Sequence, residues 1–145
     1  MKLSLTIALS HDSKILLLDE FTTGMDSGSR LKTIKMLKDF SDKGNSILFS
    51  SHIPGDIDML ANKLIFMKDQ QIIWEIDKNE LFNSFGFWDF NNNLNFNKNN
   101  VLAYKIDKND QSGVALVKSK ENTSEIRPIN SVEEVTELLM EGVII

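Results

Sequence analysis

Two adjacent acids, Asp19 and Glu20, directly follow an apolar run at residues 15–18. An uninterrupted apolar run of this kind is typical of a strand buried on both faces, in a parallel sheet covered by helices. Open α/β sheets bind ligands at the carboxyl ends of their strands, which is where the two acids lie. One carboxylate could hold Mg²⁺ against phosphate groups while the other positions or deprotonates a water. The pair therefore indicates nucleoside triphosphate hydrolysis, although a buried strand ending in an acid is about as often purely structural.

Two further features lie near this pair in the expected fold. Residues 22–26, with the sequence TTGMD, form a glycine-containing turn directly after the acids, and His52 follows a second apolar strand at 46–50. Because parallel strands bring their carboxyl ends to one edge, His52 could face the same phosphate as Glu20. Taken alone, the turn is an ordinary strand-to-helix connection with Asp26 as helix cap, and a single histidine at a strand end is usually solvated or capping. The specific signal is their combination.

The segments between these residues predict a strand–helix–strand unit. Asp26 or Ser27 can cap a helix that has apolar residues at the spacing of one face. Gly44 is placed to end this helix. With the strand at 46–50, residues 14–52 then form a right-handed parallel crossover. Residues 3–9 fit a short preceding helix, although the run is too brief to exclude a strand.

The remainder of the chain predicts further elements and a boundary. After a short helix at 56–61, a β-hairpin is expected at 64–67 and 71–76, followed by a helix capped by Asp77. Residues 91–100 contain seven asparagines, which disfavour helix and strand. Strands at 101–106 and 114–118 and a final helix opened by a capping box at 131–134 follow. We expect a first domain at 1–85, a linker at 86–100 and an accessory α+β segment at 101–145.

Composition excludes several classes of protein. The net charge of −5 over 145 residues argues against nucleic acid as a partner, because a basic face is needed to neutralise phosphates. Without cysteine there is no disulfide or thiolate metal site, and two histidines are too few for structural zinc. No apolar run approaches the ~20 residues of a membrane span, and the first residues lack a signal-peptide pattern. A cytoplasmic protein is expected.

Taken in their order along the chain, these motifs resemble the C-terminal half of the nucleotide-binding domain of ATP-binding-cassette (ABC) transporters. The resemblance covers residues 2–85 and implies an α/β fold, a partial P-loop NTPase fold with parallel strands and helices. The tail is similar, more loosely, to the small α+β C-terminal extension of bacterial exporter-type subunits. The matching segments are the helix after the signature loop at 2–9, the Walker B strand at 15–19, the catalytic Glu20, the D-loop at 23–26 and the switch histidine (H-loop) His52.

The resemblance implies a role for each of these residues. Asp19 would bind Mg²⁺ through water, Glu20 would polarise the attacking water, and His52 would contact the γ-phosphate of ATP. Asp26 would signal across a head-to-tail dimer, because ATP in this family is sandwiched between two such domains. The implied partners are a second nucleotide-binding domain and a membrane subunit, with the chain at the cytoplasmic side, peripheral to the cell membrane.

The chain departs from the family pattern in two ways. Phe21 replaces the proline that follows the glutamate, which should loosen Glu20 and reduce hydrolysis without abolishing it. The Walker A loop, Gly-x-x-x-x-Gly-Lys-[Ser/Thr], is absent from the sequence, as are the glutamine loop and the signature motif, which we expect to precede residue 1. We therefore expect uncovered apolar surface and no ATPase activity from the chain alone.

Other readings remain open beside a transporter ATPase, present as a truncated or split half. In a non-catalytic interaction module that binds a partner subunit, Asp19, Glu20 and His52 would be inherited but idle. An ATPase head of the SMC type shares a similar acid pair, D-loop and histidine, but the long coiled-coil insertions of those heads would require heptads, and no sustained heptad occurs here.

Overall fold

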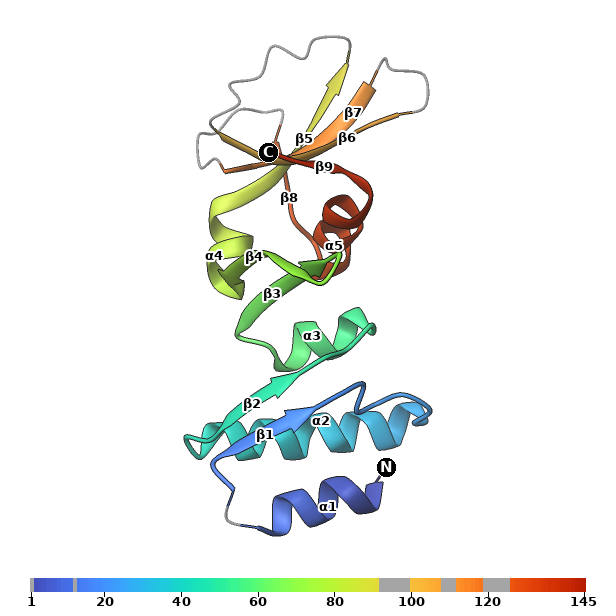
Figure 1. Cartoon of the computed structure of the whole chain (residues 1–145), viewed down its shortest axis with the longest axis vertical. Coiled ribbons are helices and arrows are strands. Elements are labelled where there is room, and N and C mark those ends of the chain that lie inside the picture. The colour runs from blue at the N-terminus through green and yellow to red at the C-terminus, as the bar shows by residue number, and fades with distance from the viewer. Residues whose placement is uncertain (1, 12, 92–99, 108–111, 119–125) are drawn as a thin grey trace. The chain divides into compact units, whose positions relative to one another are not determined.

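The computed structural model describes residues 2–11, 13–91, 100–107, 112–118 and 126–145. The chain divides into two compact units, Met1–Leu60 and Ala61–Ile145, called here the first and second units (Figure 1). Helices and strands alternate along the first unit, and the α/β fold class expected from the sequence is confirmed. In the described part of the chain, every helix is too short or too polar to cross a lipid bilayer.

The first unit is built on one strand–helix–strand crossover. Its strands β1 (Ile15–Leu18) and β2 (Ser46–Phe49) pair in parallel, with Leu18 opposite Phe49. Helix α2 (Ser27–Asp42) connects them, and helices α1 (Lys2–Ser10) and α3 (Pro54–Leu60) complete the unit. The parallel pairing predicted from the two apolar runs is confirmed.

Helix α2 begins and ends where its sequence predicts. The Asp26 side chain accepts a hydrogen bond from the Ser29 N–H at 3.0 Å, which satisfies one of the unpaired donors of the first turn. At the other end, the Gly44 N–H donates to the Ser41 carbonyl at 2.9 Å, with φ of +84° at Gly44. Glycine reaches this left-handed conformation without a Cβ penalty, so the chain can turn sharply into β2.

The β1–β2 sheet is apolar on both faces but covered on one. The core on the covered face is formed by the buried residues Leu16, Phe21, Ile34 and Leu37. On the opposite face Ile15, Leu17 and Leu48 are 64%, 74% and 60% exposed. The uncovered apolar surface expected from the sequence is therefore present in the first unit.

The second unit begins with a β-hairpin of β3 (Lys63–Lys68) and β4 (Gln71–Asp77). The two residues of its turn, Asp69 and Gln70, have φ values of +50° and +65°. Positive φ at both central positions is the geometry whose twist suits a two-residue hairpin. Asp77 then caps helix α4 (Lys78–Ser84) by accepting from the N–H groups of Asn79 and Glu80.

A five-stranded antiparallel sheet with the strand order β8-β5-β7-β6-β9 forms the rest of the second unit. Helix α5 (Val132–Glu141) begins at Ser131, whose hydroxyl accepts from the Glu134 N–H, and contacts the sheet. Its buried residues are Val132, Val135, Leu138 and Leu139. The strands are β5 (Phe85–Asn91), β6 (Val101–Ile106), β7 (Ser112–Lys118), β8 (Ile126–Pro128) and β9 (Val143–Ile144).

The structure differs from the predicted linker at 86–100. Its first residues, up to Asn91, belong to strand β5, and residues 92–99 lie outside the described residues. The aromatic side chains of this segment favour a strand, and Phe87 and Phe90 are buried. The burial of these aromatic side chains stabilises the strand, although the asparagines that follow in the sequence disfavour one. The predicted domain limits at 85 and 101 stay a prediction.

The capping role of Asp77 can be tested by substitution. We expect Asp77→Ala to lower the free energy of unfolding of the second unit by about 1 kcal/mol, because two helix N–H groups lose their acceptor. Asp77→Ser keeps an acceptor and should cost only about a few tenths of a kcal/mol. Both tryptophans of the chain, Trp74 and Trp88, lie in this unit, so urea denaturation followed by tryptophan fluorescence reports it directly. Equal losses in both variants would contradict the capping role.

Candidate functional site

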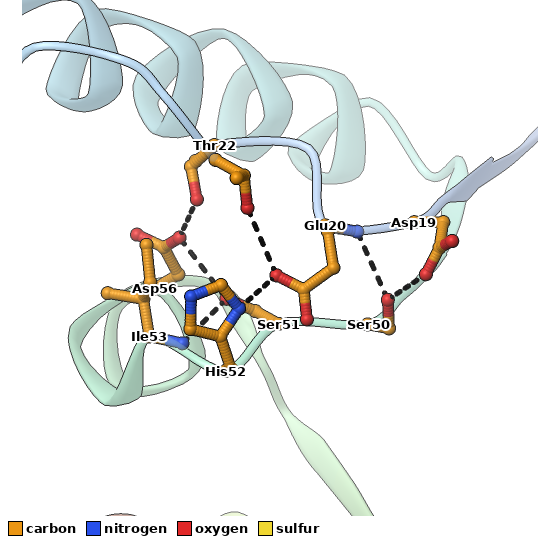
Figure 2. A network of polar contacts seen from close by, with 9 residues as sticks. Asp19, Glu20, Thr22, Ser50, Ser51, His52, Ile53 and Asp56 are labelled. Atoms are coloured by element: carbon orange, nitrogen blue, oxygen red, sulfur yellow. Dashed lines mark hydrogen bonds and ion pairs between the residues drawn. The ribbon is translucent and has the colours of Figure 1, made fainter.

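The polar residues that follow β1 and β2 meet at one edge of the first unit. Asp19 and Glu20 come directly after β1, while Ser50, Ser51 and His52 come directly after β2 (Figure 2). Because the two strands are parallel and end opposite each other, at Leu18 and Phe49, these turns leave the sheet side by side. The backbone continues the pairing there, since the Ser50 N–H donates to the Leu18 carbonyl at 2.9 Å.

Glu20 and His52 are hydrogen-bonded to each other. His52 Nδ1 contacts Glu20 Oε2, and the Thr23 hydroxyl donates to the same oxygen at 3.2 Å. An ionised carboxylate only accepts hydrogen bonds, so Nδ1 carries the proton and Nε2 of a neutral ring is an acceptor. The side chains are 67% (His52) and 38% (Glu20) exposed. The pair therefore presents a carboxylate and an imidazole to solvent at the sheet edge.

Asp19 is joined to Glu20 through Ser50. The Ser50 hydroxyl donates to Asp19 Oδ1 at 2.5 Å and accepts from the Glu20 N–H at 3.1 Å (Figure 2). The Glu20 N–H also lies 3.2 Å from the Ser50 carbonyl oxygen. One serine thus fixes the side chain of the first acid and the backbone of the second. Sequence reasoning did not single out Ser50, whose only signal was a polar residue at the end of the second strand.

The backbone of Glu20 lies in the left-handed region, with φ of +45°. This conformation is uncommon for a residue with a side chain and costs about 1–2 kcal/mol. The next residue, Phe21, is 4% exposed, and its ring packs edge-on against Phe49 at 5.5 Å. A proline at position 21 would restrict Glu20 towards extended backbone, whereas Phe21 anchors the turn by burial. Whether hydrolysis is reduced stays a prediction.

Asp26 lies at the other end of the turn. Its side chain caps α2, which confirms the structural role expected for it, and Gly24 in between has φ of +75°. The carboxylate is exposed. Its signalling role across a dimer stays a prediction.

A second cluster lies beneath the turns and includes residues that sequence reasoning did not assign to the site. The Asp56 carboxylate is fully buried and contacts Thr22, Arg30 and Ser51. In the sequence Asp56 is one of two acids in a short helix. Its burial depends on the ion pair with Arg30, which is distant along the chain, and this pairing can be recognised only in the folded structure.

An acid at this edge can supply one of the several oxygen ligands that Mg²⁺ requires. No group of three acidic or histidine side chains in the described parts of the chain could hold a metal ion without other ligands. Mg²⁺ typically keeps several waters and is held by one or two carboxylates together with substrate phosphates. The Asp19 carboxylate, which the Ser50 hydroxyl orients, is a candidate for one of these carboxylate ligands.

The comparisons with known proteins point to the class that the sequence resembles, the ABC-type ATPases with their P-loop NTPase fold. No family model matches the chain. Over about half its length, however, it is similar to curated ATP-binding proteins of ABC transporters. The uncharacterised ABC transporter ATP-binding protein YxlF of Bacillus subtilis is 31% identical over 80 residues, which are 55% of this chain and 27% of YxlF.

Two further relatives carry names that include a transport role. The lantibiotic transport ATP-binding protein SrtF of Streptococcus pyogenes is 32% identical over 89 residues, 57% of this chain and 39% of SrtF. The ABC transporter ATP-binding protein NatA of Bacillus subtilis is 31% identical over 83 residues, 57% of this chain and 34% of NatA. The matched part of the chain thus spans well under half the length of these relatives.

The strained backbone of Glu20 predicts an unusual stability pattern. We expect Glu20→Gly to be more stable than Glu20→Ala by about 1 kcal/mol, because glycine occupies the left-handed region freely. Gly24→Ala should lower stability by a similar amount, since no atom lies within 4 Å of the added Cβ and only backbone strain acts. Native-state hydrogen exchange of the α2 amides measures both effects in the first unit. A Glu20→Gly variant no more stable than Glu20→Ala would show that Glu20 is not held in this conformation.

Proposed function

We propose that the chain is part of the ATP-binding and ATP-hydrolysing subunit of an ABC transporter, with its catalytic edge at Asp19, Glu20 and His52. The observation that carries the proposal is the hydrogen bond between Glu20 and His52 at the carboxyl edge of two parallel strands, with Asp19 held beside them by Ser50. The similarity to transporter ATP-binding proteins supports the same assignment.

In this proposal each side chain has a distinct task. Asp19 would hold Mg²⁺, which would neutralise charge on the phosphates of ATP when bound. Glu20 orients the attacking water and accepts its proton, for which a positioned carboxylate suffices. With Nδ1 bound to Glu20, His52 keeps Nε2 for the γ-phosphate, to which it donates as the doubly protonated ring because phosphate oxygens only accept. Asp26 communicates with a second nucleotide-binding domain.

The phosphate-binding loop has to come from outside the sequence of this chain. The chain contains no Gly-x-x-x-x-Gly-Lys-[Ser/Thr] motif, whose backbone N–H groups and lysine cradle phosphates. The exposed apolar face formed by Ile15, Leu17 and Leu48 supports a further covering segment, since both faces of a parallel sheet are normally buried. We propose that a longer polypeptide or a partner completes the domain, which works with a membrane subunit on the cytoplasmic side.

A second candidate is a non-catalytic interaction module. The same exposed apolar face favours it, because such a surface binds a partner whether or not ATP is hydrolysed. In that case the contact between Glu20 and His52 serves only to join the two turns.

A chimeric protein separates the two functions. Residues 2–85 would replace the corresponding segment of NatA, which supplies the remaining parts of the domain. If Glu20 acts on the water, Glu20→Gln should reduce ATP hydrolysis about 10²–10⁴-fold, the usual contribution of a general base. His52→Ala should also reduce hydrolysis, whereas Asp39→Asn, at an exposed acid of α2, should not. A chimera with full activity after Glu20→Gln would exclude the catalytic role and favour the interaction module.

The isolated chain should not bind MgATP tightly. The acids and His52 contact only one end of the nucleotide in this proposal, and the cradle for the other phosphates is missing. Isothermal titration calorimetry of the purified chain with MgATP should therefore give no stoichiometric binding. Tight binding of one nucleotide per chain would contradict a requirement for an external phosphate loop.

A further inference from the structure

Asp56 is an acid whose carboxylate is completely removed from solvent. It lies in the short helix α3 and is 0% exposed. Burial of an ionised carboxylate is strongly unfavourable unless the group is paired and hydrogen-bonded. Here Arg30 of α2 donates through Nε to Oδ1, and the Thr22 hydroxyl donates to Oδ2. The Ser51 hydroxyl lies 3.4 Å from Oδ2 as a third donor.

The positions of these donors in the chain connect Asp56 with the catalytic edge. Thr22 comes two residues after Glu20, in the turn that leaves β1, and is itself 2% exposed. Ser51 comes directly before His52, in the turn that leaves β2. Figure 2 shows the Asp56 carboxylate between these two turns, on the far side of His52 from Ser50. One carboxylate therefore contacts both turns that carry the Glu20–His52 pair.

Each turn is also fixed internally by the residues that bind Asp56. The Ser51 hydroxyl accepts from the Ile53 N–H at 3.1 Å, and the Asp56 N–H donates to the Ile53 carbonyl at 3.0 Å. On the other turn, the Met25 N–H donates to the Thr22 carbonyl at 3.0 Å. Moving Asp56 would thus disturb the backbone on both sides of the catalytic pair.

We propose that Asp56 is a positioning residue, whose buried carboxylate sets the distance between Glu20 and His52 by binding Thr22 and Ser51 together. Arg30 pairs with the carboxylate in its buried place. The catalytic consequence rests on the proposed function, but the positioning itself concerns only the geometry of this chain.

The hydrogen bonds distinguish this role from a simple buried ion pair. A buried ion pair can often be replaced by apolar side chains without loss of stability. Apolar substitutes for Asp56 and Arg30 would, however, leave the Thr22 and Ser51 hydroxyls without their acceptor. A Cβ at Gly55 would lie 2.9 Å from Arg30 Nη2, so a larger residue there would require the end of the Arg30 side chain to shift.

The test follows the imidazole nitrogens of His52 in the full chain by ¹⁵N NMR at a fixed pH. The chain has only two histidines, and His11, whose Nδ1 contacts the Ile7 carbonyl at 2.8 Å, is an internal control. Glu20→Ala defines the signals of His52 without its carboxylate partner. Asp56→Asn removes the charge with little change of shape, and Thr22→Val removes a single donor. Asp39→Asn is the matched control acid on the surface of α2.

We expect Asp56→Asn to move the His52 signals most of the way to their positions in Glu20→Ala, and Thr22→Val to move them part of the way. The double variant Glu20→Ala/Asp56→Asn should match Glu20→Ala, because the contact can be lost only once. His11 should not change, nor should either signal in Asp39→Asn.

A purely structural Asp56 would give a different result. The thermal midpoint would fall while the His52 signals of the folded protein stayed in place, and that outcome overturns the proposal. If Asp56→Asn does not fold, unchanged His52 signals in Thr22→Val overturn it equally. Neither readout involves ATP, so a failure here is distinct from a failure of the ATPase assignment.

Discussion

The parallel pairing of β1 with β2 is the constraint on which the whole site depends. It brings the residues after Leu18 and the residues after Phe49 to the same edge, although about thirty residues separate them in the chain. The contacts that join the two turns run from Ser50 to Asp19 and Glu20 and from His52 to Glu20. The crossover helix α2 makes this pairing possible, and its start at Asp26 and end at Gly44 therefore matter for the geometry of this edge as well as for stability.

Two kinds of polar contact, which differ in their contribution to folding stability, connect the residues at this edge. The Glu20–His52 pair is largely exposed, where an ion pair or hydrogen bond contributes little to folding because water competes. The Asp56–Arg30 pair is buried on the carboxylate side, where loss of one partner leaves an uncompensated charge. The exposed pair therefore contributes little to the stability of the fold, whereas the buried Asp56 carboxylate contacts residues of both turns.

Local patterns in the sequence predicted most elements of this fold, and longer-range contacts explain what they did not predict. Helix caps at Asp26, Asp77 and Ser131 and the apolar runs of β1 and β2 depend on neighbouring residues, so they could be identified from spacing alone. Strand β5 was missed because its burial against β7 and β8 outweighs the nearby asparagines. Asp19, Glu20 and His52 could be selected by type and position, but Ser50 and Asp56 acquire their meaning only from partners brought close by folding.

The contact between Glu20 and His52 at the edge of β1 and β2 carries the proposed function. Nuclear Overhauser contacts between the His52 ring protons and the Glu20 side-chain methylenes, measured in the full chain, test it most directly. The geometry described here predicts clear cross-peaks for His52 and none between Glu20 and His11. Cross-peaks that place the His52 ring elsewhere, with β1 and β2 still paired in parallel, would contradict a shared catalytic edge.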